Sequence, residues 1–350
     1  MKVALVHDDL VQWGGAERIL EVLCEIYPEA PIFTSIFDYS NNQLRKRFAN
    51  KKIITSFLQK IPGWRSLYKA LLPLYPLAFE QFMFDEYDLV ISHTTRFAKC
   101  VITKPKTIHI CYCHTPPRFL WHFSKEDYGV LELYLSKLRI YDQVSARRVD
   151  FYIAGSENAK KRIKRVYNLD SKVIYPLVDL DRFKNVETFD GGYFVFIGRP
   201  ESFSNRYKRI DLAKAACDAL GLPLKIISGS FSDEMVVQIL AGCRALIIPG
   251  EEDFGLVSLE AQALGKPVIA YREGGNLETV IEGKTGLFFD KPTVESLIIT
   301  LKRFNDLSSL ETGLNHWSKE ESCKKNAQKF SKNHFISNFK QTVASLLYTN

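Results

Sequence analysis

Short apolar segments alternate with segments of helical periodicity along almost the whole chain. The apolar segments are rich in β-branched and aromatic residues and carry few polar positions, which is typical of strands buried on both faces of a sheet. In the first half they are residues 2–8, 31–37, 88–94, 108–114, 151–156 and 172–176; in the second half they are residues 193–199, 224–229, 245–250 and 267–271. A turn at Gly283 and Gly286 predicts one more short apolar strand.

Stretches with apolar residues at helical spacing separate these strands. They are residues 16–27, 137–149, 210–220, 232–242, 257–265 and 293–304. Regular alternation of strand and helix predicts parallel sheets with right-handed crossovers, an α/β fold class. A chain of 350 residues is too long for one small core, so we expect two Rossmann-like, doubly wound domains facing a cleft.

A polar, turn-rich segment at residues 176–192 separates the two series of alternating elements. We place an N-terminal domain at residues 1–176 and a C-terminal domain at residues 190–330. The tail has helical apolar spacing and no strand after it. We therefore expect a C-terminal helix at residues 331–350 that docks on one of the two domains, with the N-terminal domain as the first candidate.

The net charge of +7 is concentrated in residues 39–79. That segment holds eight lysine and arginine residues, no aspartate or glutamate, and many aromatic and aliphatic residues. Such a mixture suits an anionic membrane surface, and the alternative is a solvated basic face over an ordinary core. No nucleic-acid-binding motif accompanies the patch, so we expect no nucleic-acid partner.

No apolar run is long enough to span a bilayer, and the first residues form a short strand rather than a secretory signal. We expect a cytoplasmic protein, peripheral at the inner face of the membrane. The seven cysteines are scattered, and Cys111 and Cys113 are too close for a CxxC pair. They predict buried thiols rather than a zinc site or a disulfide framework.

Two candidate binding residues or motifs follow strands of the first domain. Gly14-Gly15 stands between the first strand and its helix, where backbone amides can approach an anion, although the pattern is not GxGxxG and a simple tight turn is the alternative. His114 ends a strand before Thr115-Pro116-Pro117 and is expected to project into the cleft, where its ring can bond a sugar hydroxyl.

The second domain offers a cationic pair and two carboxylates. Arg199 and Lys208 flank a loop after the first strand and suit a diphosphate. The segment EEDFGLVSLE places Glu252 before a helix N-terminus and Glu260 about two turns into that helix. Free amides at Phe254, Gly255 and Leu256 can hold phosphate, while the two carboxylates each accept hydroxyl hydrogen bonds from a sugar.

Two further features of the second half carry weaker signals. Gly274-Gly275 precedes another helix and supports a bound nucleotide or only connects helix and strand, with neither favoured. Asp179-Leu180-Asp181 imitates a DxD metal motif but lies in the expected interdomain segment. We interpret it as turn and capping chemistry and expect no metal and no cofactor.

These residues carry a family resemblance. The whole chain resembles the family-4 glycosyltransferases, which have the two-domain GT-B fold, and its most specific part is the pair Glu252 and Glu260 within EEDFGLVSLEAQALGKPVIA. The motifs GR…YKRID and YCHTPPRFLW are similar to a bacterial subgroup that adds mannose or related sugars to lipopolysaccharide, O-antigen or exopolysaccharide.

The resemblance implies retaining transfer of a hexose from a nucleotide-diphospho-sugar, without a required metal, to a lipid-linked saccharide. It implies that Glu252 contacts the donor hexose, Glu260 the ribose, and Arg199 and Lys208 the diphosphate. It also implies that His114 contacts the donor sugar and that Gly14-Gly15 lies near the phosphates and the acceptor. Mannose from GDP-mannose is the expected donor. Alternatives are another nucleotide sugar of the UDP-glucose type, a GT-B-shaped epimerase or phosphorylase, and a non-enzymatic polyanion- or membrane-binding protein.

Overall fold

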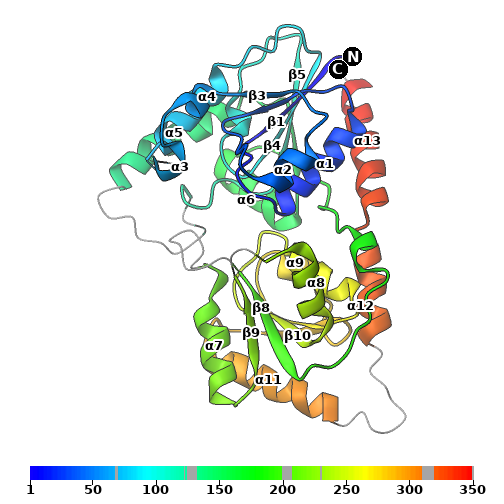
Figure 1. The fold of residues 1–350 in the computed structure, drawn as a ribbon. Coiled ribbons are helices and arrows are strands. Elements are labelled where there is room, and N and C mark those ends of the chain that lie inside the picture. Colours follow the sequence, from blue (N-terminus) through cyan, green and yellow to red (C-terminus); the bar gives the residue numbers. More distant parts are fainter. Residues whose placement is uncertain are drawn as a thin grey trace. The chain divides into compact units, whose positions relative to one another are not determined.

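The computed structural model describes residues 1–67, 70–121, 123, 132–198, 207–228, 231–309 and 319–348. The chain divides into two compact units. The first unit contains Met1–Phe123, Asp127–Tyr175 and Ile336–Asn350, and the second contains Pro176–Phe335. Each unit is built on its own sheet, so each is described separately below (Figure 1).

The first unit is built on a seven-stranded parallel sheet in the order β3-β2-β1-β4-β5-β6-β7. The strands are β1 Val3–His7, β2 Ile32–Thr34, β3 Ile53–Thr55, β4 Leu89–Thr94, β5 Ile108–Cys113, β6 Phe151–Ala154 and β7 Ser171–Val173. The strand order reverses between β1 and β4. In open α/β sheets such a switch point opens a crevice at the carboxyl ends of the strands, where ligands bind.

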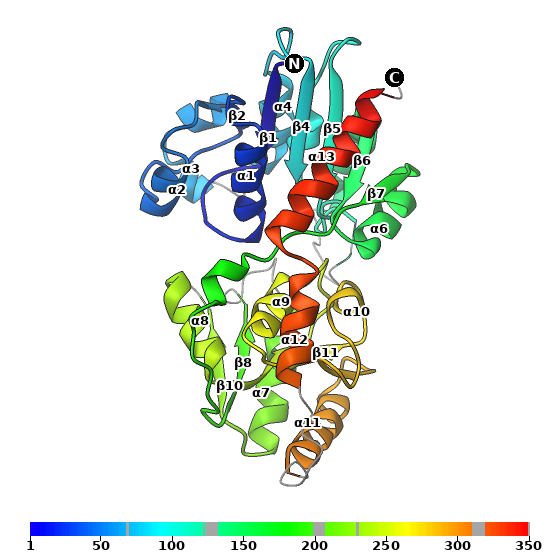
Figure 2. The same ribbon diagram turned by 90° about the vertical axis from the view of Figure 1, so that its right-hand side faces the viewer.

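Helices cover the sheet of the first unit on its two faces (Figure 1). They are α1 Gly15–Ile26, α2 Asn42–Arg47, α3 Trp64–Leu67, α4 Tyr75–Glu80, α5 Glu132–Ala146, α6 Glu157–Tyr167 and α13 Lys332–Tyr348, with short 3₁₀ turns that include η3 Ala98–Cys100. The C-terminal helix α13 lies against this sheet, where the ring of Phe339 packs 6.4 Å from that of Tyr112 on β5 (Figure 2).

The second unit has a five-stranded parallel sheet in the order β12-β11-β10-β8-β9. Its strands are β8 Tyr193–Ile197, β9 Leu224–Ile227, β10 Cys243–Ile248, β11 Val268–Tyr271 and β12 Gly286–Phe289. Its helices are η5 Leu180–Phe183, α7 Ile210–Ala219, α8 Asp233–Ala241, α9 Leu256–Ala263, α10 Asn276–Thr279, α11 Val294–Ser309 and α12 Lys319–Gln328. Here the switch point lies between β8 and β10.

Continuous apolar strands explain why both faces of the second sheet are covered. Phe194 and Phe196 of β8 belong to the cluster of buried residues shared with α7 and α11, whereas Val195 belongs to the cluster shared with α8 and α9. Successive side chains of a strand point to opposite faces, so a strand buried on both faces has no polar alternation. The same pattern holds in β4, whose six residues are all buried.

The predicted α/β class with two parallel-sheet domains is confirmed. The strands expected from apolar runs are present, most of them one to three residues shorter than the runs. β3 was not expected, because its three residues are only half-buried and lie inside the basic segment 39–79. All seven cysteines are buried and outside any disulfide, as expected for thiols that pack as small apolar residues. Among the described residues, no helix is both long and apolar enough to cross a bilayer.

Candidate functional site

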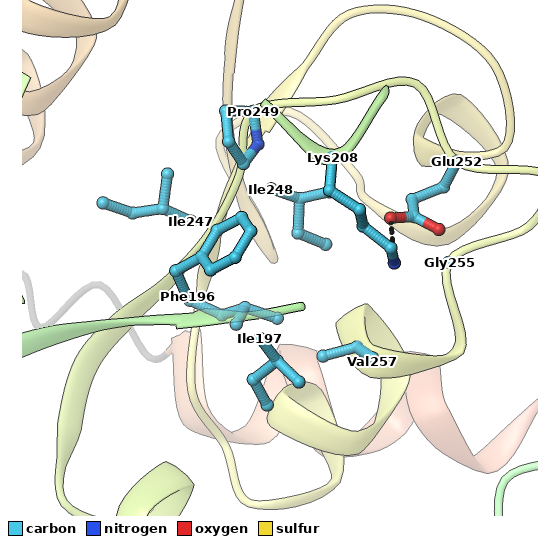
Figure 3. A pocket seen from close by; sticks show the side chains of 10 residues that line it. Phe196, Ile197, Lys208, Ile247, Ile248, Pro249, Glu252, Gly255 and Val257 are labelled. Atoms are coloured by element: carbon cyan, nitrogen blue, oxygen red, sulfur yellow. Dashed lines mark hydrogen bonds and ion pairs between the residues drawn. The ribbon is translucent and has the colours of Figure 1, made fainter. Parts of the chain in front are cut away.

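A pocket opens at the switch point of the second sheet. It is lined by residues at the carboxyl ends of β8 and β10 and by the loop before α9, which are Phe196, Ile197, Lys208, Leu246, Ile247, Ile248, Pro249, Glu252, Gly255 and Val257 (Figure 3). Its floor is apolar and its polar groups are few. A small number of polar groups above an apolar floor is typical of a site for an organic ligand.

Lys208 and Glu252 meet at this pocket. Lys208 Nζ donates to Glu252 Oε1 at 2.6 Å, as Figure 3 shows, and their side chains are 21% and 14% exposed. Both charges are therefore largely removed from water and each compensates the other. A ligand that carries a negative group and a hydroxyl group can take both side chains at little cost, because each charge exchanges one partner for another.

The backbone around the pair is packed too closely for larger residues. A Cβ atom at Gly250 would lie 1.9 Å from the carbonyl oxygen of Tyr207, so only glycine lets the segment carrying Lys208 approach the end of β10. Asn276 is fully buried and its Nδ2 donates to the carbonyl oxygens of Gly250 at 3.0 Å and Tyr271 at 2.9 Å. These contacts fix the loop that carries Glu252.

The Gly274-Gly275 turn supports the same loop. The amide of Gly275 donates to the carbonyl oxygen of Glu252 at 2.8 Å, and a Cβ atom at Gly275 would lie 2.3 Å from Phe254 Cα. The turn is therefore more than a connection from helix to strand. It holds the backbone of the segment between Glu252 and α9, a role that neither alternative from the sequence described, and its support of a nucleotide stays a prediction.

Helix α9 starts directly after this loop. Gly255 is its N-cap with a φ of +94°, a left-handed conformation that favours glycine. Phe254 is buried and packs 5.5 Å from Phe330. The first amides of an α-helix have no partner within the helix, and here the residues around them, Glu252, Gly255 and Val257, line the pocket.

Glu260 lies on α9 but has a different partner from Glu252. Arg182 Nη1 donates to Glu260 Oε1 at 2.9 Å, and Arg182 Nη2 lies 3.7 Å from Asp233 Oδ1. Arg182 belongs to η5, within the segment that the sequence analysis treated as connecting the domains. Phe183 beside it is part of the core of the second unit. Arg182 was missed because nothing in its local sequence marks it as a partner of a residue 78 positions away.

The expected capping role of Asp179 is confirmed, since its side chain accepts from the amide of Asp181 at the start of η5. Asp181 itself pairs with Lys184 at 2.5 Å. In the described part of the chain, no group of three or more histidine, cysteine, aspartate or glutamate side chains is arranged to hold a metal ion. Arg199 lies outside the described residues.

His114, the candidate of the first unit, stands at the end of a row of histidines. His7 and His93 are paired in register on β1 and β4, at the switch point of the sheet. His7 Nδ1 lies 2.9 Å from His93 Nδ1, and His93 Nε2 lies 2.6 Å from His114 Nε2. His7 and His93 are buried, and His114 is half-buried. Of the three histidines, only His114 was predicted from the sequence.

Asp8 organises the loop that follows β4 and His93. Its buried carboxylate accepts hydrogen bonds from Thr94 Oγ1 and from the amides of Thr95, Arg96, Phe97 and Ala98, at 2.7–3.0 Å. Burial alone would raise the pKa of Asp8, but the charge of Arg96 and these amide donors lower it below its ordinary value. The carboxylate is thus a permanent charge that fixes the loop beside the histidines.

The Gly14-Gly15 turn forms the start of α1, with Gly14 as its N-cap. The guanidinium groups of Arg18 and Arg47 approach the ring of Trp13, just before this turn, to 5.5 and 5.0 Å. Two cations close to one indole bring positive charge near the glycine turn, although the charge of Arg47 is also paired with Glu21. This arrangement suits an anionic group near the turn.

Comparison with known proteins identifies the chain. Residues 13–182 match the model described as Glycosyltransferase Family 4, and residues 183–330 match the model described as Glycosyl transferases group 1. The alpha-1,3/1,6-mannosyltransferase ALG2 of Mus musculus is 33% identical, and the alignment covers 99% of this chain and 96% of that protein. The chain belongs to glycosyltransferase family 4. It is a glycosyltransferase, as its resemblance to that family predicted.

Solved structures show that this family-4 glycosyltransferase has the GT-B fold. Sucrose-phosphate synthase from Thermosynechococcus elongatus is similar with a TM-score of 0.74, 15% identity and full coverage of both chains. HepE of Anabaena in complex with UDP is similar with a TM-score of 0.67 and 17% identity, over 99% of this chain and all of that one. The predicted GT-B fold is therefore confirmed.

The basic segment of the glycosyltransferase differs from the expectation in one respect. Most of its apolar residues belong to the core of the first unit, including Leu58, Trp64 and Leu71, which are buried. They pack against the sheet and cannot contact a membrane. The described part of the segment presents to solvent the charged side chains of Arg45, Lys46, Arg47, Lys52, Lys60 and Arg65, together with a few apolar ones such as Leu67 and Leu77.

Proposed function

We propose that this glycosyltransferase moves mannose, with retention, from GDP-mannose to a lipid-linked saccharide in the synthesis of bacterial surface polysaccharide or lipopolysaccharide. The observation that carries the proposal is the Lys208–Glu252 pair at the end of β8 and β10, in a chain of family 4. The alignment with a mannosyltransferase over nearly the whole chain supports mannose as the sugar.

The donor is proposed to separate Lys208 from Glu252. Lys208 then binds the diphosphate and stabilises its charge as it leaves, together with Arg199 and the amides of Phe254, Gly255 and Leu256. Glu252 accepts hydroxyl hydrogen bonds from the hexose. Glu260, held by Arg182, accepts those of the ribose.

In the first unit His114 is proposed to contact the donor sugar, and Gly14-Gly15 to lie near the phosphates and the acceptor. The reaction is proposed to be a front-face displacement in which the leaving phosphate accepts the proton of the acceptor hydroxyl. Since cationic side chains and amides stabilise the leaving group, we propose that no metal and no cofactor are required. Transfer that persists unchanged in excess EDTA supports this point, and loss of transfer restored by a divalent cation contradicts it.

The direct test supplies GDP-mannose with and without a lipid-linked saccharide acceptor and identifies products by mass spectrometry. The proposal expects a mannosylated acceptor and intact GDP-mannose when no acceptor is present. Isomerised sugar nucleotide without acceptor indicates an epimerase instead, and a product that forms only with free phosphate indicates a phosphorylase. Transfer from UDP-glucose but not from GDP-mannose retains the transferase and overturns the choice of donor.

A peripheral location at the inner face of the cytoplasmic membrane is the second part of the proposal. In the described part of residues 39–79, six basic side chains are exposed, of which Arg47 pairs with Glu21 and Arg65 with Asp38. Near an anionic bilayer each lysine or arginine contributes about 1 kcal/mol. Exposed apolar side chains close in sequence, Leu67, Leu77 and Met83, add surface that can enter the interface.

Sedimentation with vesicles tests the membrane proposal. Binding to vesicles that contain anionic lipid is expected, weakening as salt rises and absent with neutral vesicles. Replacing Lys46 and Lys60 with glutamine should weaken binding. Replacing Lys302 and Lys325 of the second unit, which are also exposed, should leave it unchanged. Equal weakening in both pairs contradicts a specific role for residues 39–79. Binding of single-stranded nucleic acid at physiological salt, without vesicle binding, favours the polyanion-binding alternative.

A further inference from the structure

Four titratable side chains of the first unit form a continuous row. Glu17 Oε1 on α1 lies 3.7 Å from His7 Nε2, and the two following contacts join His7 to His93 and His93 to His114 at 2.9 and 2.6 Å. His7 and His93 also stack, with ring centroids 5.0 Å apart and planes inclined by 16°. Both nitrogens of His93 and of His7 are used within the row, so the proton positions of the three rings depend on one another.

The carboxylate of Glu17 determines the arrangement when the three rings are neutral. The negative charge of Glu17 lies 3.7 Å from His7 Nε2, beyond hydrogen-bond distance but close enough to favour the His7 tautomer with its proton on Nε2. Its Nδ1 must then accept from His93 Nδ1–H, and His93 Nε2 must accept from His114 Nε2–H. In this state His114 Nδ1, the ring atom not directed at His93, holds a lone pair.

One added proton reverses every bond in the row. When His7 is an imidazolium, its Nδ1–H donates to His93, so His93 carries its proton on Nε2 and donates to His114. The proton of His114 is then on Nδ1. Three proton transfers produce this reversal. A proton binds His114 Nδ1, the Nε2 proton of His114 passes to His93 Nε2, and the Nδ1 proton of His93 passes to His7 Nδ1. One proton enters at His114 and one positive charge appears on His7.

We propose that Glu17, His7 and His93 are positioning residues that set which ring nitrogen of His114 carries its proton, and that they move the charge of a proton taken up at His114 to His7. His114 thereby changes from hydrogen-bond acceptor to donor at Nδ1 while its own ring stays neutral. The part of the inference that concerns catalysis rests on the proposed contact between His114 and the donor sugar. The row of contacts and its proton positions do not depend on the proposed function.

The surroundings of the three rings favour the charge on His7. Burial opposes an imidazolium, but Glu17 on α1 and the carboxylates of Asp8 and Asp9 after β1 raise the pKa of His7 above its ordinary value. Asp9 also forms an ion pair with Arg96, which reduces its effect on His7. The residue beside His7 on β2 is Thr34, which carries no charge. Burial and the two neighbouring histidines hold the pKa of His93 well below its ordinary value, so His93 passes protons without keeping them.

The position of the row in the fold also suits this role. His7 and His93 are neighbours across the switch point between β1 and β4, the place in an open α/β sheet where ligands approach. The half-buried end at His114 is the end that a ligand can reach, and the charge is stored at the buried end.

Nitrogen NMR of the protein labelled with ¹⁵N-histidine, without any donor, tests the proposal. Two-bond ¹H–¹⁵N spectra between about pH 5 and pH 9 report the tautomer of each ring, and single His→Gln variants assign the signals. The tautomer of His114 should change at one titration midpoint, and at pH values above that midpoint we expect the His114 proton on Nε2. Below it we expect the proton on Nδ1, with the imidazolium signature on His7. A His114 tautomer that does not change with pH, or a His114 ring that becomes charged itself, overturns the proposal.

Two variants and a matched control sharpen this test. Glu17→Gln removes the charge beside His7, so the midpoint should fall by about one pH unit or more. His93→Gln should make the tautomer of His114 independent of His7. His109→Gln removes another fully buried histidine, which bonds Ser92 outside the row, and should leave the midpoint unchanged. If His93→Gln fails to fold, the shift in Glu17→Gln decides alone, and an unshifted midpoint there contradicts the proposal.

Transfer kinetics then connect the row to the reaction. The pH profile of kcat in Glu17→Gln should move in the direction and by the amount that the NMR midpoint moves, whereas His109→Gln should keep the wild-type profile. A lower kcat with an unmoved profile indicates a purely structural role for Glu17. Absence of any transfer by the wild-type protein refutes the proposed function but leaves the NMR result intact, so the two failures are distinguishable.

Discussion

The switch points of the two sheets carry different chemistry. In the second unit two ion pairs, Lys208–Glu252 and Arg182–Glu260, lie on or beside the loop between β10 and α9. In the first unit three histidines follow one another across β1, β4 and the end of β5. Fixed charges suit a ligand that is itself charged, whereas neutral imidazoles suit hydroxyl groups and protons. Under the proposed function, the charged pairs of the second unit take the diphosphate and the histidines of the first unit adjust hydrogen bonding at a hydroxyl group.

The largest effect on this comparison should come from breaking the first ion pair. Glu252→Ala and Lys208→Ala should each lower kcat by about 100-fold or more, since removal of one group that stabilises developing charge has an effect of that size. The fold should persist, as checked by circular dichroism. Glu273→Gln and Lys225→Ala, exposed neighbours in the same unit, serve as controls. Activity at the wild-type level in either pair variant removes the assignment.

Backbone packing at the two sites gives the next contrast. Gly250→Ala should destabilise the protein by about 1 to 3 kcal/mol, because the added methyl group overlaps the Tyr207 carbonyl. Gly155→Ala in the first unit meets His114 only at ordinary contact distance, 3.5 Å, and should change stability little. Denaturant unfolding of both variants measures the difference. Equal stabilities argue that the segment carrying Lys208 is not packed against β10 as described.

A variant of Arg182 distinguishes the role of Glu260 from that of Glu252. Arg182→Ala leaves Glu260 without its guanidinium partner and should raise KM for the donor about tenfold, with a smaller change in kcat, as expected for a charged hydrogen bond in substrate binding. Lys184→Ala removes an exposed cation two positions further on, paired with Asp181, and should leave KM unchanged. A change in kcat alone assigns Arg182 to the reaction step instead.

Acid should affect the first unit through its buried histidines. Burial lowers the pKa of His109 to about 3, and that of His93 also lies well below its ordinary value. Well above pH 6.5, about the ordinary pKa of histidine, both are neutral in the folded and unfolded states and contribute no pH dependence. As pH falls below that value, these histidines bind protons in the unfolded chain but stay neutral in the folded chain. Stability should therefore fall by about 1.4 kcal/mol per pH unit for each such histidine.

The raised pKa of His7 opposes this effect, because protonation of His7 favours the folded state at low pH. In His109→Gln the free energy of unfolding should fall less steeply as pH is lowered. The slope should be smaller by the contribution of one histidine, about 1.4 kcal/mol per pH unit. Urea unfolding between pH 5 and pH 7 measures the slopes. A slope that His109→Gln does not change would show that His109 takes up its proton in the folded state.

The sequence predicts the fold well because apolar periodicity is a local property. Runs such as residues 88–94 and 245–250 are continuous because both faces of these strands are covered, and β4 and β10 follow them closely. The tripeptide of β3 has no such run, since its residues are half-buried at the edge of the sheet. β3 was not predicted because its position at the edge of the sheet and its short length depend on the tertiary structure.

The site was predictable only where its residues are close in sequence. Glu252, Gly255 and Glu260 stand within one loop and one helix, so their spacing indicated a site. His7 and His93 are 86 residues apart and meet only through strand register. Arg182 meets Glu260 through the packing of η5 on α9, and Asn276 reaches Gly250 from a different helix. Contacts of this kind depend on sheet order, which no local pattern contains.

Binding of the nucleotide sugar tests the central claim most directly. Thermal unfolding is to be measured for the wild-type protein and for Lys208→Met in the presence of GDP-mannose, UDP-glucose and the corresponding diphosphates, because a ligand selective for the folded state raises the apparent stability. The account predicts that GDP-mannose raises the wild-type Tm and that Lys208→Met abolishes most of this increase. An absent response to every nucleotide sugar, or an equal response in the variant, would contradict it.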